Sequence, residues 1–580
     1  MFLKLILKMQ FKPLNLLNNN KHLSNTIIMR TIYLTIALLI YGSILGYSQN
    51  FTEVLGRPTH NSITMSILFD TTAQVYWEYG TASGNYTTTT PTYNAVVDSS
   101  LIVDFTGLLT NTKYYYRTRY RVSGSTSAYL AGTERSFHTP RPVGNTFSFA
   151  IEADPHLDTN SNPTAYSLTL QNILSANPDF LFDMGDNFMS EKLPVKTQAN
   201  ITARHLLLRS YYAATCHSVP LYLVIGNHEG ELGWLIDGTS TSLPVLTTNT
   251  RKLYYPNPLP NSFYTGDTIA EPFVGLRQNY YSFEWGNCLF VVLDPYWYTI
   301  TKPDWGWTLG AAQYNWFKKT ITTSQAKFKF VLCHQLVGGS GTDGRGGAEY
   351  VDYFEMGGKN ADSTWGFTTN RPNWNDPIHT IMKNTNTDIY FHGHDHFFGK
   401  QDKDGIVYQE IPQPSNRNIT NTSAAQYGYV NGVILPGRGY LLITITDSTA
   451  KIDYIKTLLP NEITSGHNNG EIGYTYTITK SATGINENKL TDPNQLNQNY
   501  PNPFNSLTSI GYRLQSDNKV QLKVYDLLGR EIATLVDQYQ QAGNHEVALD
   551  ADKFSLKSGL YYYRITIGSN SQTKKMICIK

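Results

Sequence analysis

Hydrophobic and polar residues alternate with a period of two over residues 51–141. Ile63, Met65 and Ile67 are separated by Thr or Ser, and residues 114–120 carry Tyr or Thr at every second position. A period of two places one set of side chains on each face of a strand. The pattern predicts an all-β unit over this part of the chain.

The pattern changes to alternating strands and helices after residue 142. Residues 146–153 and 180–184 are apolar and short, as buried strands are, and residues 163–176 read as a helix that begins at a proline. Alternation of this kind predicts a layered α/β domain, which we place at residues 145–459. The polar stretch 460–489 is expected to be a linker.

Residues 490–580 return to a strand-like pattern and are expected to form a separate β domain. At the other end of the chain, Met29 and Arg30 precede an apolar run over residues 31–45. A positive residue, a short apolar run and a small-residue exit are typical of a secretory signal peptide. Residues 1–48 are therefore expected to direct export, with Met29 as a candidate start. The alternative, a membrane anchor, needs about twenty apolar residues.

Composition restricts the classes of function. The 580 residues include 46 Lys and Arg against 45 Asp and Glu, a net charge of +1. Near-neutrality argues against a broad nucleic-acid footprint, which needs a basic excess. The four cysteines have no CxxC spacing, so they predict neither a disulfide framework nor a zinc ribbon.

Five short polar motifs follow predicted strands of the central domain. In chain order they are D-P-H (Asp154, His156), G-D-N (Asp186), G-N-H-E (Asn227, His228), C-H-Q (His334) and G-H-D-H (His394, His396). Ligands gather at the carboxyl ends of strands in α/β sheets, so these loops can converge on one crevice. Their oxygen and imidazole donors suit Mn, Fe or Zn better than copper or an iron–sulfur cluster.

These five motifs, in this order, resemble those of calcineurin-like metallophosphoesterases. The resemblance implies an α/β fold with a β-sandwich core flanked by helices, and two metal ions. It places the first ion on Asp154, His156, Asp186 and His396, and the second on Asp186, Asn227, His334 and His394. Asp186 would bridge the two ions.

The resemblance also implies a phosphoester hydrolase in which a metal-held hydroxide attacks phosphorus. His228 is the expected proton donor or phosphoryl contact, together with Asn227. Arg345, in a glycine-rich stretch, is a candidate phosphate clamp, although a solvated flexible loop explains it equally well. A non-catalytic surface protein that keeps this core is the competing hypothesis, yet none of the expected ligand positions is missing.

Purple acid phosphatases, which resemble this arrangement, carry a tyrosine three residues after the motif-two aspartate. Met189 stands there in this chain, so no tyrosinate-to-iron colour is expected. Protein Ser/Thr phosphatases extend that motif to GDxxDRG, which is also absent, and His228 is therefore expected to lack a partner carboxylate at that position.

Two further resemblances concern the ends of the mature chain. Leu108, Thr112 and Tyr114 resemble the tyrosine-corner strand of fibronectin type III domains, which implies a β-sandwich at 51–141. The segment N-Q-N-Y-P-N-P-F-N, from Asn497 to Asn505, resembles the start of type IX secretion sorting domains. That resemblance implies recognition by the type IX machinery and a secreted or cell-surface protein that acts on a small-molecule or secreted phosphoester. No membrane span is expected after removal of the signal.

Overall fold

The computed structural model describes residues 51–158, 161–480, 495–499, 501–514, 516–568 and 570–580. The expected signal peptide at residues 1–48 lies outside the described residues. Contact density divides the chain into two compact units, residues 1–482 and 483–580. Each unit is described by itself.

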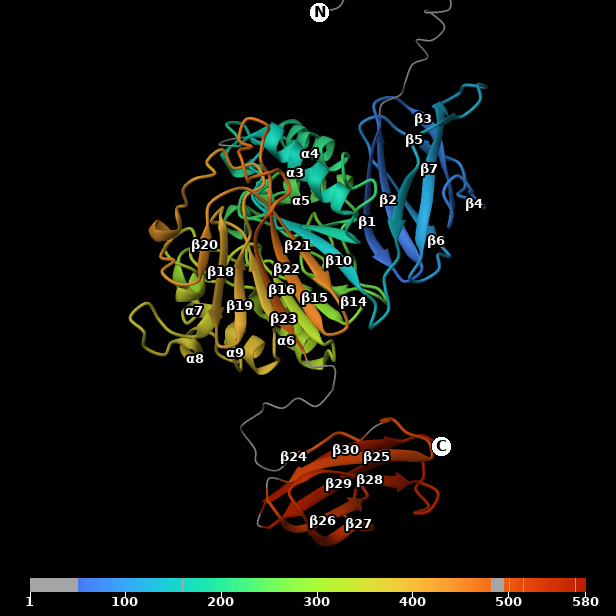
Figure 1. Cartoon of the computed structure of the whole chain (residues 1–580), viewed down its shortest axis with the longest axis vertical. Helices are drawn as coiled ribbons and strands as arrows, with labels where there is room; N and C mark the ends of the chain where they lie inside the picture. The colour runs from blue at the N-terminus through green and yellow to red at the C-terminus, as the bar shows by residue number, and fades with distance from the viewer. Residues whose placement is uncertain (1–50, 159–160, 481–494, 500, 515, 569) are drawn as a thin grey trace, which may run out of the picture. The chain divides into compact units, whose positions relative to one another are not determined.

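Two facing β-sheets with helices on both outer faces form the central domain (Figure 1). The first sheet has the order β23-β22-β21-β10-β11-β12-β1-β2-β6, and the second has the order β13-β14-β15-β16-β17-β19-β18-β20. Their central-domain strands are β10 (Phe147–Glu152), β11 (Phe180–Asp183), β12 (Leu221–Leu223), β13 (Thr265–Gly266), β14 (Tyr281–Trp285), β15 (Cys288–Val292), β16 (Phe328–Leu332), β17 (Ile389–His392), β18 (Phe398–Lys403), β19 (Ile406–Glu410), β20 (Val433–Leu435), β21 (Gly439–Ile445), β22 (Thr449–Lys456) and β23 (Ile472–Thr479).

Aromatic side chains fill the space between the two sheets. Phe149 and Phe182 from the first sheet meet Phe290 and Phe330 from the second, and the rings of Phe149 and Phe290 lie 5.0 Å apart, edge to face. Such pairs contribute about 0.5–1.5 kcal/mol each beyond the burial of their apolar area. This packed core fixes the strands, and it therefore fixes the points from which the loops at the strand ends begin.

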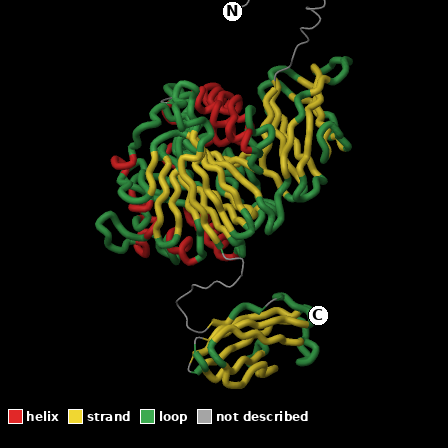
Figure 2. Tube along the Cα trace, viewed as in Figure 1, coloured by secondary structure: helices red, strands yellow, loops and turns green. Residues whose placement is uncertain are grey.

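Helices cover the outer face of each sheet, so that strands gather in the middle (Figure 2). Apolar residues of α3 and α4 pack on the first sheet, and those of α6 and α9 pack on the second. The helices are α3 (Pro163–Ala176), α4 (Gln198–Tyr212), α5 (Leu243–Tyr254), α6 (Gly310–Thr323), α7 (Phe354–Gly357), α8 (Phe367–Asn370) and α9 (Ile378–Asn384). The expected layered α/β fold is confirmed.

Helix α3 shows how the sequence sets its boundaries. The Asn162 side chain accepts a hydrogen bond from the backbone N–H of Ala165, and Pro163 occupies the first turn, where its missing N–H costs nothing. Asn177 ends the helix in the left-handed conformation. The helix expected at residues 163–176 has these bounds in the structure.

The N-terminal strands form a sandwich that shares a sheet with the central domain. Strands β1 (Phe51–Thr59), β2 (Ser62–Phe69) and β6 (Leu101–Thr106) continue the nine-stranded sheet, through one parallel pairing of Gly56 with Leu221 in β12. A Cβ at Gly56 would lie 2.4 Å from the Pro256 carbonyl oxygen, so this approach requires glycine. The facing sheet contains β3 (Ala73–Gly80), β4 (Thr88–Thr89), β5 (Tyr93–Ala95), β7 (Lys113–Val122), β8 (Leu130–Ala131) and β9 (Arg135–His138).

The tyrosine hydroxyl of Tyr114 accepts a hydrogen bond from the Leu109 backbone N–H at 2.8 Å. This contact has the form of a tyrosine corner. The fibronectin type III assignment of residues 51–141 stays a prediction, because the sheet is continuous into the central domain.

The linker expected at residues 460–489 needs correction. Residues 472–479 form β23, which pairs antiparallel with β22 along its length. Residues 460–471 contain turns and no named helix or strand, and residues 481–489 lie outside the described residues. The β23 segment reads I-G-Y-T-Y-T-I-T, and its Tyr474, Tyr476 and Ile478 pack against the core between the sheets. This alternation is a strand pattern that the linker assignment overlooked.

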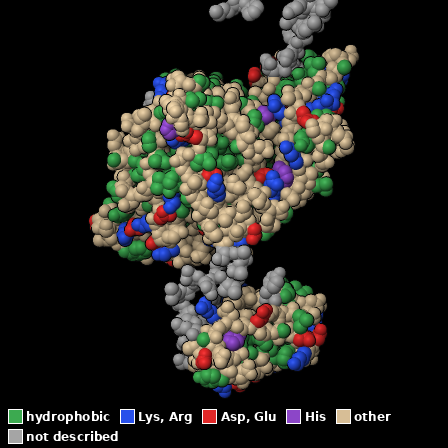
Figure 3. All heavy atoms as spheres, viewed as in Figure 1, with side chains coloured by type: hydrophobic (Ala, Val, Ile, Leu, Met, Phe, Trp, Pro, Cys, Tyr) green, Lys and Arg blue, Asp and Glu red, His purple; other side chains and the backbone are tan. Residues whose placement is uncertain are grey.

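The C-terminal unit is a smaller β-sandwich. One sheet has the order β24-β25-β28 and the other β27-β26-β29-β30, around a core that includes Leu522, Tyr563 and Ile565. The strands are β24 (Gln495–Leu496), β25 (Leu507–Leu514), β26 (Asn518–Tyr525), β27 (Glu531–Gln540), β28 (Gly543–Asp550), β29 (Gly559–Ile567) and β30 (Asn570–Cys578). Acidic and basic side chains are interspersed on the face shown in Figure 3. Within the described ranges, no helix is long and apolar enough to cross a membrane.

Candidate metal centre

The five sequence motifs occupy loops at the carboxyl ends of five strands. The loops follow β10, β11 and β12 in the first sheet and β16 and β17 in the second. Backbone hydrogen bonds tie them together: Asp154 N–H donates to the Gly185 carbonyl at 2.9 Å, and Gly393 N–H donates to the His334 carbonyl at 2.9 Å. The two sheets therefore deliver all five motifs to one edge of the sandwich.

Six of the seven expected ligands form two groups at this edge. Within each group, one candidate ligand atom per residue lies within 4.8 Å of the others. The first group is Asp154, His156 and His396, and the second is Asp186, His334 and His394. The division is the one that the sequence resemblance implied for two ions, although the assignment of individual ligands stays a prediction.

Asp186 reaches toward both groups. Its Oδ2 lies 3.2 Å from His334 Nε2 and 3.9 Å from His156 Nε2. The first group is equally compact, since the Nε2 atoms of His156 and His396 lie 3.0 Å apart. A carboxylate between two sets of donors is positioned to share its oxygens between two cations.

Buried lone pairs test whether this edge suits a cation. Among the described residues, Asp154 Oδ1, Asn227 Oδ1, His334 Nε2 and His394 Nδ1 are buried without a hydrogen-bond partner. Unpaired polar atoms cost free energy when buried. Asp154, His334 and His394 also belong to the two ligand groups, and donors of these kinds bind divalent metal ions.

Hydrogen bonds on the opposite ring nitrogens orient the two histidines of the second group. The ring nitrogen His334 Nδ1 is 2.8 Å from the Met184 carbonyl, and His394 Nε2 is 2.8 Å from the Asp343 carbonyl. Each of these nitrogens must carry a proton to bond a carbonyl, so only the opposite nitrogen of each ring can serve as a metal ligand, in the form without a proton. Those remaining atoms, His334 Nε2 and His394 Nδ1, are the ones directed to the centre.

Charge in the centre is concentrated and partly buried from water. Burial raises the pKa of Asp154 to about 7, and Asp186 adds to the effect. Burial would lower the pKa of His334, but the carboxylates of Asp186 and Asp154 outweigh it and raise that pKa to about 10. Without a cation, both shifts favour bound protons at Asp154 and His334, and a bound metal ion would displace these protons.

Five of the seven expected ligands have left-handed backbone conformations. Their φ angles are 62° at Asp154, 44° at His156, 57° at Asp186, 81° at His394 and 73° at His396. Each such conformation costs a non-glycine residue about 1–2 kcal/mol. Backbone strain is therefore concentrated where the side chains must converge.

His228 has a carboxylate partner, Glu191, at a position other than the one that protein Ser/Thr phosphatases use. Its Nδ1 lies 2.5 Å from Glu191 Oε1, and its Nε2 lies 3.8 Å from Asp186 Oδ2. Glu191 lies on the 3-10 turn Ser190–Lys192. It comes two residues after Met189, which occupies the position of the second aspartate in the GDxxDRG motif. Burial lowers the pKa of His228, but Asp186 and Glu191 outweigh that effect and raise it.

Arg345 is fixed rather than free in a solvated loop. Its Nη1 donates to the His394 carbonyl at 2.7 Å and to Asp395 Oδ1 at 2.9 Å, and its guanidinium lies 4.4 Å from the Tyr427 ring centre. The guanidinium therefore lies directly beside a ligand loop. Its function as a phosphate clamp stays a prediction.

Three buried carboxylates that the sequence analysis did not single out support the ligand loops. Asp183 accepts from the Gly185 N–H, Glu229 accepts from the Asp186 and Asn187 N–H groups, and Glu410 accepts from the Asp395 and His396 N–H groups. Glu229 closes the G-N-H-E motif and was therefore visible in the sequence. Glu410 ends β19 without any motif around it.

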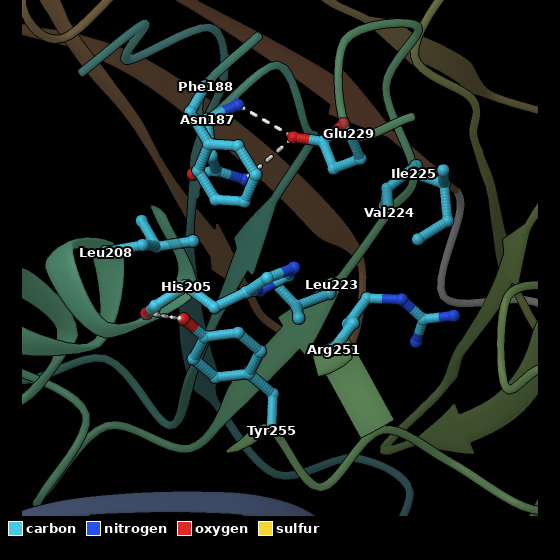
Figure 4. A pocket seen from close by; sticks show the side chains of 10 residues that line it. All are labelled: Asn187, Phe188, His205, Leu208, Leu223, Val224, Ile225, Glu229, Arg251 and Tyr255. Carbon is cyan, nitrogen blue, oxygen red and sulfur yellow. Dashed lines mark hydrogen bonds between the residues drawn. The ribbon is translucent and has the colours of Figure 1, made fainter. Parts of the chain in front are cut away.

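A small pocket lies behind the second ligand loop (Figure 4). Glu229 and Asn187 are joined by hydrogen bonds at one end of it, and His205 and Arg251 line the rest. None of the seven expected ligands lines this pocket. It is an internal space that borders the centre, distinct from a substrate entrance.

Two family models match the sequence. Residues 147–398 match the calcineurin-like phosphoesterase family, a family of metal-dependent phosphoester hydrolases, and residues 498–580 match the secretion system C-terminal sorting domain. No curated protein matches the chain in sequence.

Two solved structures share the fold. A structure of PhoD superposes with a TM-score of 0.54 at 15% sequence identity, covering 75% of this chain and 92% of that one. The purple acid phosphatase PPD1 from yellow lupin (Lupinus luteus) seeds superposes with a TM-score of 0.51 at 15% identity, covering 74% of each chain. This chain therefore carries a calcineurin-like phosphoesterase domain at residues 147–398, followed by a secretion-system sorting domain at residues 498–580.

Proposed function

We propose that the protein is an exported phosphoester hydrolase, a phosphomonoesterase or phosphodiesterase, that works with two metal ions. The observation that carries this proposal is the pair of ligand groups, in which Asp186 of the second group lies 3.9 Å from His156 of the first. Asp154, His156, Asp186 and His396 would hold one ion, and Asp186, Asn227, His334 and His394 the other. Iron, manganese and zinc all suit these donors.

Two bound cations would acidify a water molecule into a nucleophile at neutral pH and would neutralise charge on the phosphoryl group. The protein supplies the remaining steps. His228 is held by Glu191 with its Nε2 toward Asp186. The raised pKa of His228 favours its protonated form, so this imidazolium is positioned to donate a proton to the leaving alkoxide.

Arg345 and Asn227 are the candidate contacts for the phosphoryl oxygens. One Arg345 nitrogen bonds the His394 carbonyl, which places the rest of the guanidinium beside the centre. Asp395 and Tyr427 fix its orientation, so little side-chain entropy remains to be lost on binding. A fixed planar guanidinium can donate two parallel hydrogen bonds to a phosphate.

The C-terminal sorting domain supports export to the cell surface or medium by the type IX machinery. A secreted or small-molecule phosphoester would then be the substrate. The alternative, a surface-binding protein with an inactive core, gains no support from the centre, because six of the seven expected ligands belong to two compact groups of candidate donors.

Hydrolysis of p-nitrophenyl phosphate and of bis-p-nitrophenyl phosphate tests the proposal. We expect turnover of at least one ester with added Mn²⁺ or Zn²⁺, and loss of that turnover with a chelator. If the metal-loaded protein turns over neither ester, the hydrolase proposal is wrong and the binding alternative is favoured.

A further inference from the structure

We infer that Glu229 and Glu410 are the positioning residues of the metal centre, one for each side of it. The inference rests on the two-metal centre proposed above. Both side chains are buried, at 5% and 0% exposure, and neither belongs to a candidate ligand group. Each accepts several hydrogen bonds from a ligand loop.

Glu229 fixes the loop that carries the shared ligand. Its Oε2 accepts from the backbone N–H groups of Asp186 at 3.1 Å and Gly226 at 2.7 Å. Its Oε1 accepts from the Asn187 backbone at 2.8 Å and from the Asn187 side chain at 3.4 Å (Figure 4). Both carboxylate oxygens therefore receive backbone donors, from the loops before and after β12.

Glu410 fixes the G-H-D-H loop in a different manner. Its Oε1 accepts from the backbone N–H groups of Asp395 at 3.0 Å and His396 at 2.9 Å. Its Oε2 lies 2.8 Å from Nδ1 of His392 but has no hydrogen-bond partner. Only one of the two Glu410 oxygens receives backbone donors.

This difference predicts opposite responses to the same substitution. A glutamine at 229 must turn its amide NH₂ toward a backbone N–H, because both oxygens have such a donor. A glutamine at 410 can keep its oxygen on the two backbone groups, and its NH₂ then takes the Oε2 position, which receives no N–H donor. Hence E229Q should disturb the loop, whereas E410Q should be tolerated.

The two residues should also affect different ions. Glu229 supports Asp186, which both groups use, so its loss should weaken both sites. Glu410 supports His396, which belongs to the first group alone. Loss of a residue that orients a ligand typically weakens metal binding about 10–100-fold.

Zinc titration of the full chain, followed by calorimetry and metal analysis, tests the inference without measuring activity. We expect two zinc ions per wild-type chain, binding of both weakened about 10–100-fold in E229Q, and binding of one weakened similarly in Glu410→Leu. E410Q should bind both with wild-type affinity. Melting of each metal-free variant records whether it folds.

Glu355→Gln is the matched control, because Glu355 is equally buried, pairs with Arg371 and touches no ligand loop. It should bind two zinc ions normally. The inference is overturned if E229Q binds zinc like the wild type, or if Glu355→Gln weakens zinc binding as much as E229Q does. If Glu410→Leu does not fold, E410Q decides for Glu410, since weakened zinc binding in a folded E410Q contradicts the prediction that an NH₂ can replace Oε2 without loss. A wild-type chain that binds no zinc pair would instead contradict the proposed function.

Discussion

The C-terminal sandwich has an almost wholly apolar interior, whereas the ligand-bearing edge of the central domain is filled with charge. Among the described residues of 495–580, the buried polar side chains are those of Asn499 and Thr508. The ligand-bearing edge of the central domain buries the carboxylates of Asp154, Asp186 and Glu410. Asp154 and Glu410 accept hydrogen bonds from the adjacent backbone N–H groups of residues 394 and 395. Buried carboxylates oppose folding unless they are paired or bind a cation.

Backbone strain divides the two regions in the same way. In the described part of the C-terminal unit, Ser555 is the single non-glycine residue with a left-handed φ. The metal centre has five such residues among its expected ligands. The C-terminal unit can form its sandwich with ordinary backbone conformations. The metal centre has strained conformations because its donor side chains must point to a common place.

The largest difference between the two regions should appear when one aspartate in each is replaced, Asp186 in the metal centre and Asp537 in the C-terminal unit. Asp186→Asn removes the charge that the two proposed metal ions would share, so kcat/KM should fall by about 10³-fold or more. Asp537→Asn, an exposed aspartate of the C-terminal unit, is the control and should leave the rate unchanged. Steady-state hydrolysis of p-nitrophenyl phosphate measures both. Substantial activity in Asp186→Asn would contradict the shared role.

Replacement of the proton donor should have a smaller and separable effect. His228→Ala is expected to lower kcat by about 10²–10⁴-fold while two metal ions remain bound, because His228 is not among the expected ligands. Glu191→Gln should lie between this variant and the wild type. Turnover and metal content are measured on the same sample, and full activity in His228→Ala would show that the assigned role is wrong.

The buried ring of His205 should make the stability of the central domain depend on pH. Burial and nearby Arg251 lower the pKa of His205 to about 3 in the folded protein, against about 6.5 in an unfolded chain. The stability from keeping this ring neutral is complete above pH 6.5 and is lost as the pH falls toward 3, by about 1.4 kcal/mol per pH unit. When the pH falls from 6.5 to 5, the free energy of unfolding of His205→Phe should therefore decrease by about 2 kcal/mol less than that of the wild type.

Denaturant unfolding at pH 6.5 and pH 5 measures how much unfolding free energy each of the two proteins loses. Changes common to both proteins, including metal release, cancel in this comparison. Equal losses of unfolding free energy in wild type and His205→Phe would mean that His205 is not the buried neutral ring described above.

The smallest effect on chemistry should follow removal of the sorting domain. A chain that ends at residue 482 keeps the whole first unit, so its turnover should stay within about twofold, as expected for a unit with its own core. The same deletion should keep the protein inside a host that has type IX secretion. A large loss of turnover in the purified shortened protein would show that the two units act together.

The sequence was most informative where chemistry is local. The five motifs follow short apolar strands, so their convergence could be predicted from the rule that ligands gather at strand ends. The helix at 163–176 could be predicted because Asn162, Pro163 and Asn177 carry their boundary signals within the segment itself.

Partners distant along the chain could not be predicted from local pattern. Glu410 reaches the G-H-D-H loop from β19, and Glu191 reaches His228 across 37 residues. Gly56 joins the N-terminal strands to β12 through a single backbone pairing. In each case the sheet topology creates the contact, and a single Glu or Gly carries no periodicity to reveal it.

Anomalous X-ray diffraction from crystals of the zinc-loaded protein tests the central claim most directly. The account predicts two peaks per chain, about 3.5–4 Å apart, on either side of the Asp186 carboxylate, one beside His156 and His396 and the other beside His334 and His394. A zinc-saturated crystal with one peak or none at this edge would contradict it.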